Sequence, residues 1–377
     1  MKNKILLLFF VSFFASNAQK VDLDHFYFDA NYQVLPQEFV PMEKRTFSTN
    51  VRLGGTVQTI FSSPDINNKL NIIGWKKLDE NATVSVELNL EDFIESGATT
   101  ETRVEEDKDK GGNVIARRVY YYVLSRYTTR GYANIKGPTT PIPLSTKEIE
   151  AEKAKETAAS TNRFLKNVAI KKDAAIVNGF YMNLSSNLDY KSPESTDSNK
   201  PLKDFYLNKN AVREQMLRSF VENSKNSVIN RINYTYGFVP RFEKQDLWIL
   251  DAKSEEGMAQ IEAIKAVRTL FSTMKADEPI DELRSNMAPL IDYFNSLKTK
   301  YTEDNKPGRK MRYSAYYNLA IIYLILDEPE KTILEAEKLI LNDYDKSDGK
   351  GLINQANQLI ATFNISKLRS RHNPPLK

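Results

Sequence analysis

The residue types that carry most enzyme chemistry are scarce in this chain. Its 377 residues include two histidines and no cysteine. His25 lies between Asp24 and Phe26 in an alternating segment with no evident partner, and His372 lies close to the C-terminus. Ser–His–Asp catalysis would need one of these two histidines, and a zinc site would need more nitrogen or sulfur ligands than they supply. The sequence therefore predicts neither serine nor thiol catalysis, and no zinc site.

Carboxylates are the remaining candidates for chemistry. Glu87, Glu91 and Asp92 are close enough in sequence to suggest the acid pair of a glycoside hydrolase, but they alternate with apolar residues and fit the solvent face of a strand. The acidic loops at 107–111 and 343–349 lack the ligand spacing of a calcium-binding EF-hand. We therefore expect no cofactor and no enzymatic activity, with a carboxylate-dependent hydrolase as the alternative.

The N-terminus has the three parts of a secretory signal peptide. Two lysines precede the apolar run Ile5–Phe14, and the small residues Ser16 and Ala18 fit a cleavage site. The apolar run is well short of the ~20 residues that a membrane-spanning helix needs. We expect residues 1–18 to be removed. The mature chain is then expected in the periplasm or at the periplasmic face of the outer membrane, with no transmembrane segment.

Residues 19–137 are predicted to form a β-rich domain. Apolar and polar residues alternate through Thr83–Phe93, as in a strand with one buried face. Aromatic and β-branched residues favour further strands over His25–Val34, Thr46–Leu53, Leu70–Leu78 and Val114–Arg126. Several short strands in succession favour an antiparallel, sandwich-like arrangement. The charged segment Thr99–Asn113 is expected to be a hairpin tip.

Residues 138–250 are predicted to form a mixed α/β connecting region. A capping box at Ser145–Glu148 begins a polar helix that runs to about Lys166. The pattern then predicts a strand within 168–184, a loop over 185–201, a helix over Asn208–Ile229 and a strand over Asp246–Leu250.

Residues 251–366 are predicted to form an all-α bundle, followed by a basic tail over 367–377. Apolar residues recur at helical spacing in five segments joined by short loops. The expected fold class is therefore α+β, with the β-rich region first and the helices last.

One segment of the bundle, Ala315–Asp343, resembles a single tetratricopeptide repeat (TPR). Tyr316, Leu319 and Tyr323 stand where that repeat has its first-helix aromatic, leucine and second aromatic, whereas Asp327 replaces the turn glycine. The resemblance implies a helical hairpin within a TPR-like bundle.

The first helix of this hairpin, Met311–Leu326, is apolar on almost every side. A helix of that kind is buried all round. In a TPR the positions of Tyr317, Ile321 and Leu324 face an open groove. We therefore expect these three side chains to be covered, either by another helix of this chain or by a partner protein.

The sequence as a whole predicts a non-catalytic interaction or accessory protein of the cell envelope. Tyr317, Ile321 and Leu324 are candidate protein-binding residues, and the nearby cations Arg309 and Arg312 are candidates for docking to an acidic protein or an anionic lipid surface. The net charge of only +4 gives no electrostatic case for nucleic acid. The expected partner is another envelope protein, such as an outer-membrane complex.

Two further resemblances concern the source and setting of the chain. The N-terminal segment and the Asn-, Lys- and Tyr-rich composition resemble exported proteins of Bacteroidota. A β-rich region joined to a TPR-like bundle is similar to accessory proteins of type IX secretion, including the plug that closes the translocon pore. That resemblance implies, as an alternative function, a subunit of such a translocon.

Overall fold

The structure is a computed structural model that describes residues 22–138, 179–250 and 255–376. The chain forms two compact units. The first, which we call the helical unit, is discontinuous and comprises Met1–Gln33 and Pro240–Asn373. The second, the arm unit, comprises Val34–Val239 and Pro374–Lys377. The predicted signal peptide and the predicted helix after Ser145 lie outside the described residues.

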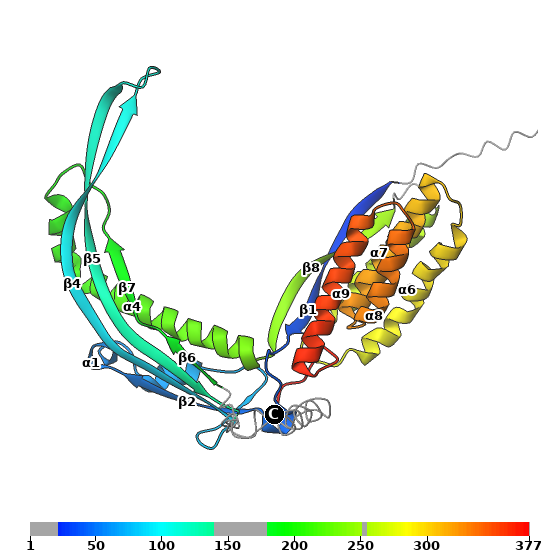
Figure 1. Ribbon diagram of the computed structural model, residues 1–377, viewed down its shortest axis with the longest axis horizontal. Helices are drawn as coiled ribbons and strands as arrows, with labels where there is room; N and C mark the ends of the chain where they lie inside the picture. The colour runs from blue at the N-terminus through cyan, green and yellow to red at the C-terminus, as the bar shows by residue number, and fades with distance from the viewer. Residues whose placement is uncertain (1–21, 139–178, 251–254, 377) are drawn as a thin grey trace, which may run out of the picture. The chain divides into compact units, whose positions relative to one another are not determined.

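Five helices and a pair of strands build the described part of the helical unit (Figure 1). The elements are α5 (Glu255–Ser272), α6 (Asp281–Lys300), α7 (Lys306–Ile325), α8 (Pro329–Leu341), α9 (Lys346–Ser366), β1 (Leu23–Val34) and β8 (Val239–Leu250). The prediction of C-terminal helices is confirmed. Consecutive helices from α6 to α9 pack against each other, and α7 is the most buried of them, with Leu319, Ala320 and Ile322 fully covered.

The strands β1 and β8 pair with each other and pack on the helices as a two-stranded ribbon. His25 contacts Asp246, and Tyr27 lies against Lys244, so residue numbers rise on one strand as they fall on the other, as in antiparallel pairing. Phe28 and other alternate residues of β1 belong to the same apolar core as the helices. The prediction placed these strands in two separate domains. Their pairing moves both into the helical unit, because their apolar face covers the helices.

The arm unit contains one six-stranded sheet in the order β3-β2-β4-β5-β6, with β7 also paired to β5. Its strands are β2 (Thr46–Leu53), β3 (Lys76–Lys77), β4 (Val84–Lys108), β5 (Val114–Lys136), β6 (Gly179–Asn183) and β7 (Ser186–Lys191). Short helices η1 (Met42–Lys44), α1 (Gly55–Gln58) and α2 (Ser63–Lys69) and the long helix α4 (Lys200–Tyr236) complete it.

This sheet is not the antiparallel sandwich that the sequence predicted. Strand β2 runs parallel to both β3 and β4, since the connection through α1 and α2 is long enough for a crossover. In the described residues, α4 packs against β4, β5 and β7 where a second sheet was expected. Three boundaries also differ: β7 lies within the predicted loop, only Lys76–Lys77 of the predicted strand 70–78 is extended, and α4 exceeds the predicted helix at both ends.

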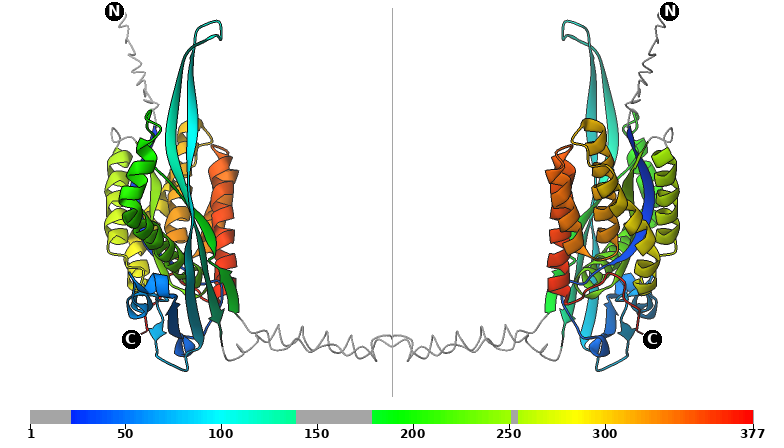
Figure 2. Two further views of the ribbon diagram at one scale, coloured as in Figure 1. Left: turned by 90° about the vertical axis from the view of Figure 1, so that its left-hand side faces the viewer. Right: turned by 90° about the vertical axis from the view of Figure 1, so that its right-hand side faces the viewer.

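The longest strands, β4 and β5, pair from Ser85 and Lys136 out to Lys108 and Val114. We call the outer part of this hairpin, residues 99–120, the arm, and its tip extends beyond the end of α4 (Figures 1 and 2). The predicted hairpin tip is therefore mostly strand. Only residues 109–113 turn, and there the Asp109 carboxylate accepts the backbone N–H groups of Gly111 and Asn113.

In the part of the chain that the structure describes, none of the helices combines the length and apolar character required to cross a membrane.

Candidate binding groove in the helical unit

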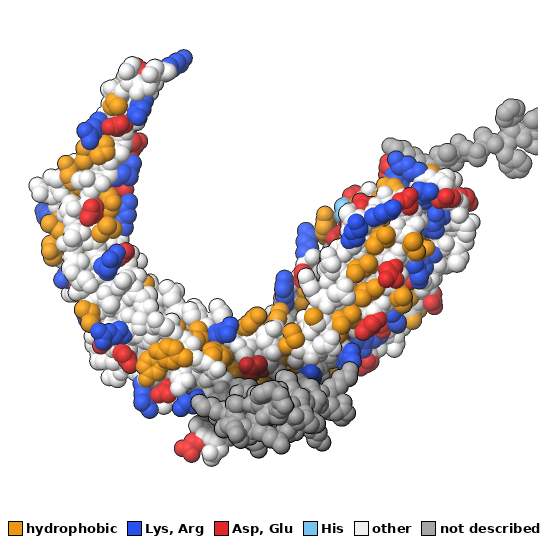
Figure 3. All heavy atoms as spheres, in the orientation of Figure 1, with side chains coloured by type: hydrophobic (Ala, Val, Ile, Leu, Met, Phe, Trp, Pro, Cys, Tyr) orange, Lys and Arg blue, Asp and Glu red, His pale blue; other side chains and the backbone are white. Residues whose placement is uncertain are grey.

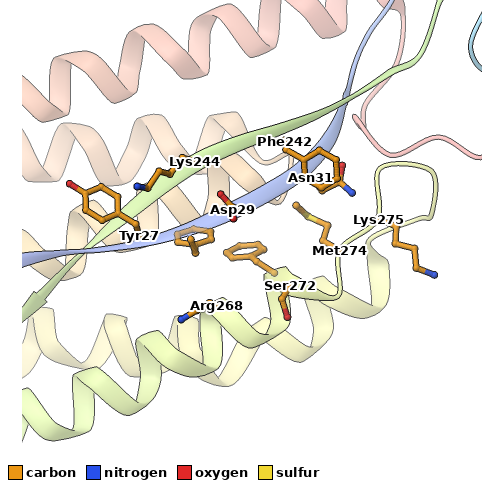
Figure 4. Close-up of a pocket in the computed structure, with 11 residues that line it drawn as sticks. Tyr27, Asp29, Asn31, Phe242, Lys244, Arg268, Ser272, Met274 and Lys275 are labelled. Atoms are coloured by element: carbon orange, nitrogen blue, oxygen red, sulfur yellow. The ribbon is translucent and has the colours of Figure 1, made fainter.

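A groove of about 510 Å³ lies beside the ribbon at the C-terminal end of α5 (Figure 4). We call it the ribbon groove. Its lining comes from β1 (Tyr27, Phe28, Asp29, Asn31), β8 (Phe242, Lys244), α5 (Arg268, Phe271, Ser272) and the turn after α5 (Met274, Lys275). The volume is within the range of about 300–1,000 Å³ that is usual for ligand sites.

Strand alternation explains why β1 contributes both buried and exposed side chains to the groove. Phe28 points into the core, where its ring stacks on Phe271 of α5 with centroids 5.3 Å apart. Successive side chains of a strand point to opposite faces, so Tyr27 and Asp29, which flank Phe28, are exposed. Two exposed aromatics, Tyr27 and Phe242 (74% exposed), give the groove an apolar rim.

Cations predominate around the groove. Lys244 lies over the Tyr27 ring at 4.3 Å, and Arg268 lies 5.9 Å from the centre of the Phe26 ring. Within the described chain neither cation forms an ion pair, whereas Lys275 pairs with Glu278 outside the groove at 2.7 Å. Asp29 is the only carboxylate in the lining. The charge therefore favours an acidic ligand.

One buried polar atom of a residue that lines the groove lacks a hydrogen-bond partner in the described chain. The side-chain oxygen Oδ1 of Asn31 is buried and accepts no hydrogen bond within the described chain. A buried acceptor without a donor costs about 1–3 kcal/mol.

The C-terminal tail, predicted as a basic tail over 367–377, is anchored next to the groove. Asp327, whose side chain is fully buried, accepts from the Arg371 Nε–H at 2.6 Å and from the Arg371 backbone N–H at 2.7 Å. The Arg371 carbonyl then accepts the backbone N–H of Gln33 in β1 at 2.8 Å. Residues 370–373 therefore connect the turn after α7 to the ribbon.

His25 has a partner that the sequence did not reveal. Its ring Nδ1 lies 2.7 Å from the Asp246 carboxylate, which also accepts from the Tyr317 hydroxyl at 3.3 Å. A His–Asp pair can act as a general base when a nucleophile lies beside it. Burial raises the pKa of Tyr317, so this hydroxyl stays protonated, and the other ring contacts of His25 are Tyr27 and Trp248. The pair is therefore best explained as a cross-strand contact of the ribbon.

The ribbon also covers two of the three predicted protein-binding residues of α7, Tyr317 and Ile321. Ile321 is 3% exposed and Leu324 is 7% exposed, and the Tyr317 ring meets that of Trp248 at 6.1 Å. The Asn318 amide holds the ribbon in place by bonding both the N–H and the C=O of Trp248 at 2.8 Å. Two strands supply the cover for which a helix or a partner was expected. Ile321 and Leu324 are consequently not available to another protein in this structure.

The predicted docking cations have structural partners. Arg309 bonds Asp304 at 2.8 Å and lies 3.4 Å from Asp343. Arg312 donates to the carbonyls of Tyr301 at 2.7 Å and Glu303 at 2.9 Å. The sequence does not distinguish arginines that face solvent from arginines that bond other groups of the same chain. Here it holds the α6–α7 loop, which corrects the prediction that these arginines are free to dock.

The same region holds two carboxylates beside a cavity. Asp304 and Asp343 line a second cavity of about 480 Å³, but hydrogen bonds to Arg309 and to Lys346, respectively, lower the pKa of these two carboxyls. An acid–base pair needs one carboxyl whose pKa is raised, so these two do not fit that role. Among the described residues no group of three or more His, Asp or Glu side chains is placed to hold a metal ion.

No protein family, curated protein or solved structure matches this chain. The ribbon groove itself was missed by the sequence analysis. Phe242 and Lys244 precede the predicted strand Asp246–Leu250 in a mostly polar stretch, which gave no sign of the longer strand β8. Arg268 offered no sign of its own, because an exposed arginine on an amphipathic helix is ordinary.

Proposed function

We propose that this protein is a non-catalytic interaction protein of the cell envelope that binds another protein at the ribbon groove. The observation that carries the proposal is the composition of the groove: two cations with no ion-pair partner among the described residues and two exposed aromatic side chains around an open volume. Aromatic residues and arginine are the types enriched where proteins bind each other tightly. Nothing in the lining combines a nucleophile with a base.

Two features of the sequence support the envelope setting. Residues 1–18 have the pattern of an export signal, and the α7–α8 hairpin stands where the sequence resembles a TPR, a repeat used for protein contacts. A subunit of a type IX secretion translocon, such as its pore plug, remains the specific alternative within this class. It rests on the resemblance of architecture alone.

The proposal is tested by cross-linking and co-purification from native membranes with the full-length exported protein. Arg268→Glu combined with Lys244→Glu reverses the groove charge. Lys265→Glu is the matched control, since Lys265 is exposed on the same helix and outside the groove. We expect the double variant to lose a partner that the wild type and the control retain. Equal recovery of the same partners by all three would contradict the proposal.

A further inference from the structure

The outer edge of β1 is open for strand pairing along the groove. In an antiparallel pair, the N–H and C=O of one residue both point to the partner strand, and those of the next residue both point away. The Gln33 N–H donates to the Arg371 carbonyl at 2.8 Å and therefore points away from β8. Alternation then places the N–H and C=O of Asn31, Asp29 and Tyr27 on this same outer edge.

The ribbon groove runs along these three residues. Tyr27, Asp29 and Asn31 line it from β1, and Arg268 and Ser272 line it from α5 (Figure 4). An exposed strand edge bearing free N–H and C=O groups is a template for another extended chain. The groove therefore combines such an edge with the side chains that would flank an added strand.

The protein's own tail shows that the edge accepts extended chain. At Gln33 the backbone pairs with Arg371, and the Gln33 side chain brackets Asn373 by donating to its carbonyl at 2.8 Å and accepting its N–H at 3.1 Å. This is strand-like recognition by main chain and side chain together. In the described part of the chain β8 is the one strand paired with β1, and the tail uses the outer edge at Gln33, which leaves Tyr27 to Asn31 open.

We propose that the ribbon groove binds an extended acidic segment of the partner protein, which adds to the outer edge of β1 as a third strand. This inference rests on the proposed function and specifies how the partner is held. Strand addition takes affinity from main-chain hydrogen bonds and specificity from alternate side chains. Here Lys244 and Arg268 select carboxylates, and the exposed Phe242 ring provides a contact for an apolar neighbour.

Synthetic peptides test this mode of binding with the mature full-length protein. The first probe is a fluorescein-labelled peptide of about eight residues in which Glu alternates with Val, and the comparison peptide replaces Glu with Lys. Fluorescence anisotropy should show binding of the acidic peptide at least about tenfold tighter, a difference of about 1.4 kcal/mol. Arg268→Glu should weaken the acidic peptide about tenfold, while Lys265→Glu leaves it unchanged.

Two N-methylated versions of the acidic peptide test the strand itself. Methylation of every second nitrogen removes the N–H groups of one edge only, because alternate residues share an edge. We expect one of the two versions to lose binding by about tenfold or more and the other to bind as the parent does. Equal binding of both versions would overturn strand addition, and equal binding of the Glu and Lys peptides would overturn the acidic specificity.

These outcomes separate the inference from the proposed function. A membrane partner that depends on Arg268, together with acidic peptides that do not bind, would leave the groove as an interaction site and overturn strand addition. Peptide binding with the expected N-methyl pattern, but no partner lost on charge reversal, would support the edge and contradict the groove as the physiological contact.

Discussion

The two units of this protein keep their apolar surface from water in different ways. In the helical unit, strands from the start and the middle of the chain close over helices that follow them, and most of α7 is buried as a result. In the arm unit, the inner parts of β4 and β5 are buried, but their outer parts extend into solvent. Val104 and Ile115 in these outer parts are 42% and 68% exposed. The first unit depends on distant segments, whereas the outer arm depends on little beyond its own two strands.

Ion pairs between exposed side chains, instead of buried apolar contacts, are the main side-chain interactions of the arm. Arg103 bonds Glu194 at 2.8 Å and Arg118 bonds Asp107 at 3.0 Å. Figure 3 shows side chains of both signs over this region, with apolar ones between them. Charged side chains on strand edges hinder pairing with other chains, and a two-stranded ribbon alone is only marginally stable in water. The arm is therefore kept soluble by its charges and contributes little to the stability of its unit.

The largest expected difference between the units concerns fragments. A fragment of residues 240–373 lacks β1, so Phe271 and the ribbon-facing side of α7 lose their cover, and each fully buried apolar side chain is worth about 1.5–3 kcal/mol. We expect no cooperative thermal unfolding by circular dichroism until a synthetic peptide of residues 22–33 is added. The continuous fragment 34–239 should unfold cooperatively without help. Cooperative unfolding of 240–373 at the same temperature with and without the peptide would contradict the dependence on β1.

The next largest effect is expected from the buried ion pair of the tail. Asp327→Asn leaves Arg371, only 11% exposed, without its counter-charge, and we expect a loss of about 3 kcal/mol in the free energy of unfolding of the helical unit. The asparagine tolerates the left-handed backbone at this position (φ 60°). Asp281→Asn is the control, because its pair with Arg284 is at the surface, and chemical denaturation should show a change of at most about 1 kcal/mol. Similar losses for both would mean that the tail is not an anchor.

A smaller effect, confined to the helical unit, is expected from pH. Burial lowers the pKa of His372, whose ring Nδ1 bonds the Lys275 carbonyl at 2.9 Å. Its pKa in the folded state is then below the unfolded value of about 6.5. The unfolded state binds the proton more readily, so stability present at neutral pH falls as the pH drops below about 6.5. His372→Gln should flatten this dependence in thermal melts between about pH 5 and 7.5, and an unchanged slope would assign it to other groups.

The smallest effect is expected in the arm. Replacing residues 104–119 with an Asn-Gly turn joins Arg103 to Tyr120, which face each other in the hairpin. We expect the free energy of unfolding of the arm unit to change by less than about 1 kcal/mol, since the deleted contacts are at the surface. Leu88→Ala, in the fully buried part of β4, should cost about 2–5 kcal/mol in the same denaturant titration. A comparable loss on shortening would show that the arm supports its unit.

Local patterns in the sequence predicted local structure well. Strand β2 has the predicted bounds Thr46–Leu53, because alternation and β-branched residues act over a few neighbours. The apolar surface of Met311–Leu326 correctly indicated a largely buried helix, although Tyr316, Tyr317 and Tyr323 are only partly buried. Helix α4 begins at Lys200, before the predicted Asn208, and the added residues include Phe205, which is buried by tertiary contacts.

Features that depend on distant pairing could not be obtained this way. The sequence of β1 does not indicate that β8 is its partner. Only the three-dimensional structure therefore shows the cover of α7, the partner of His25 and the ribbon groove. The same holds for Arg309 and Arg312, whose carbonyl and carboxylate partners lie in a neighbouring loop and at the end of α8. Side-chain type sets what a residue is able to bind, but topology decides what is within reach.

The ribbon also imposes an order on the synthesis of the chain. His25 and its partner Asp246 are 221 positions apart, so β1 leaves the ribosome long before β8 exists. A closure of that length costs about 2 kcal/mol more in chain entropy than one ten times shorter. Residues 34–239 of the arm unit are made in the interval and can fold first, while β1 waits with the apolar side chains of Phe28 and Tyr32 uncovered.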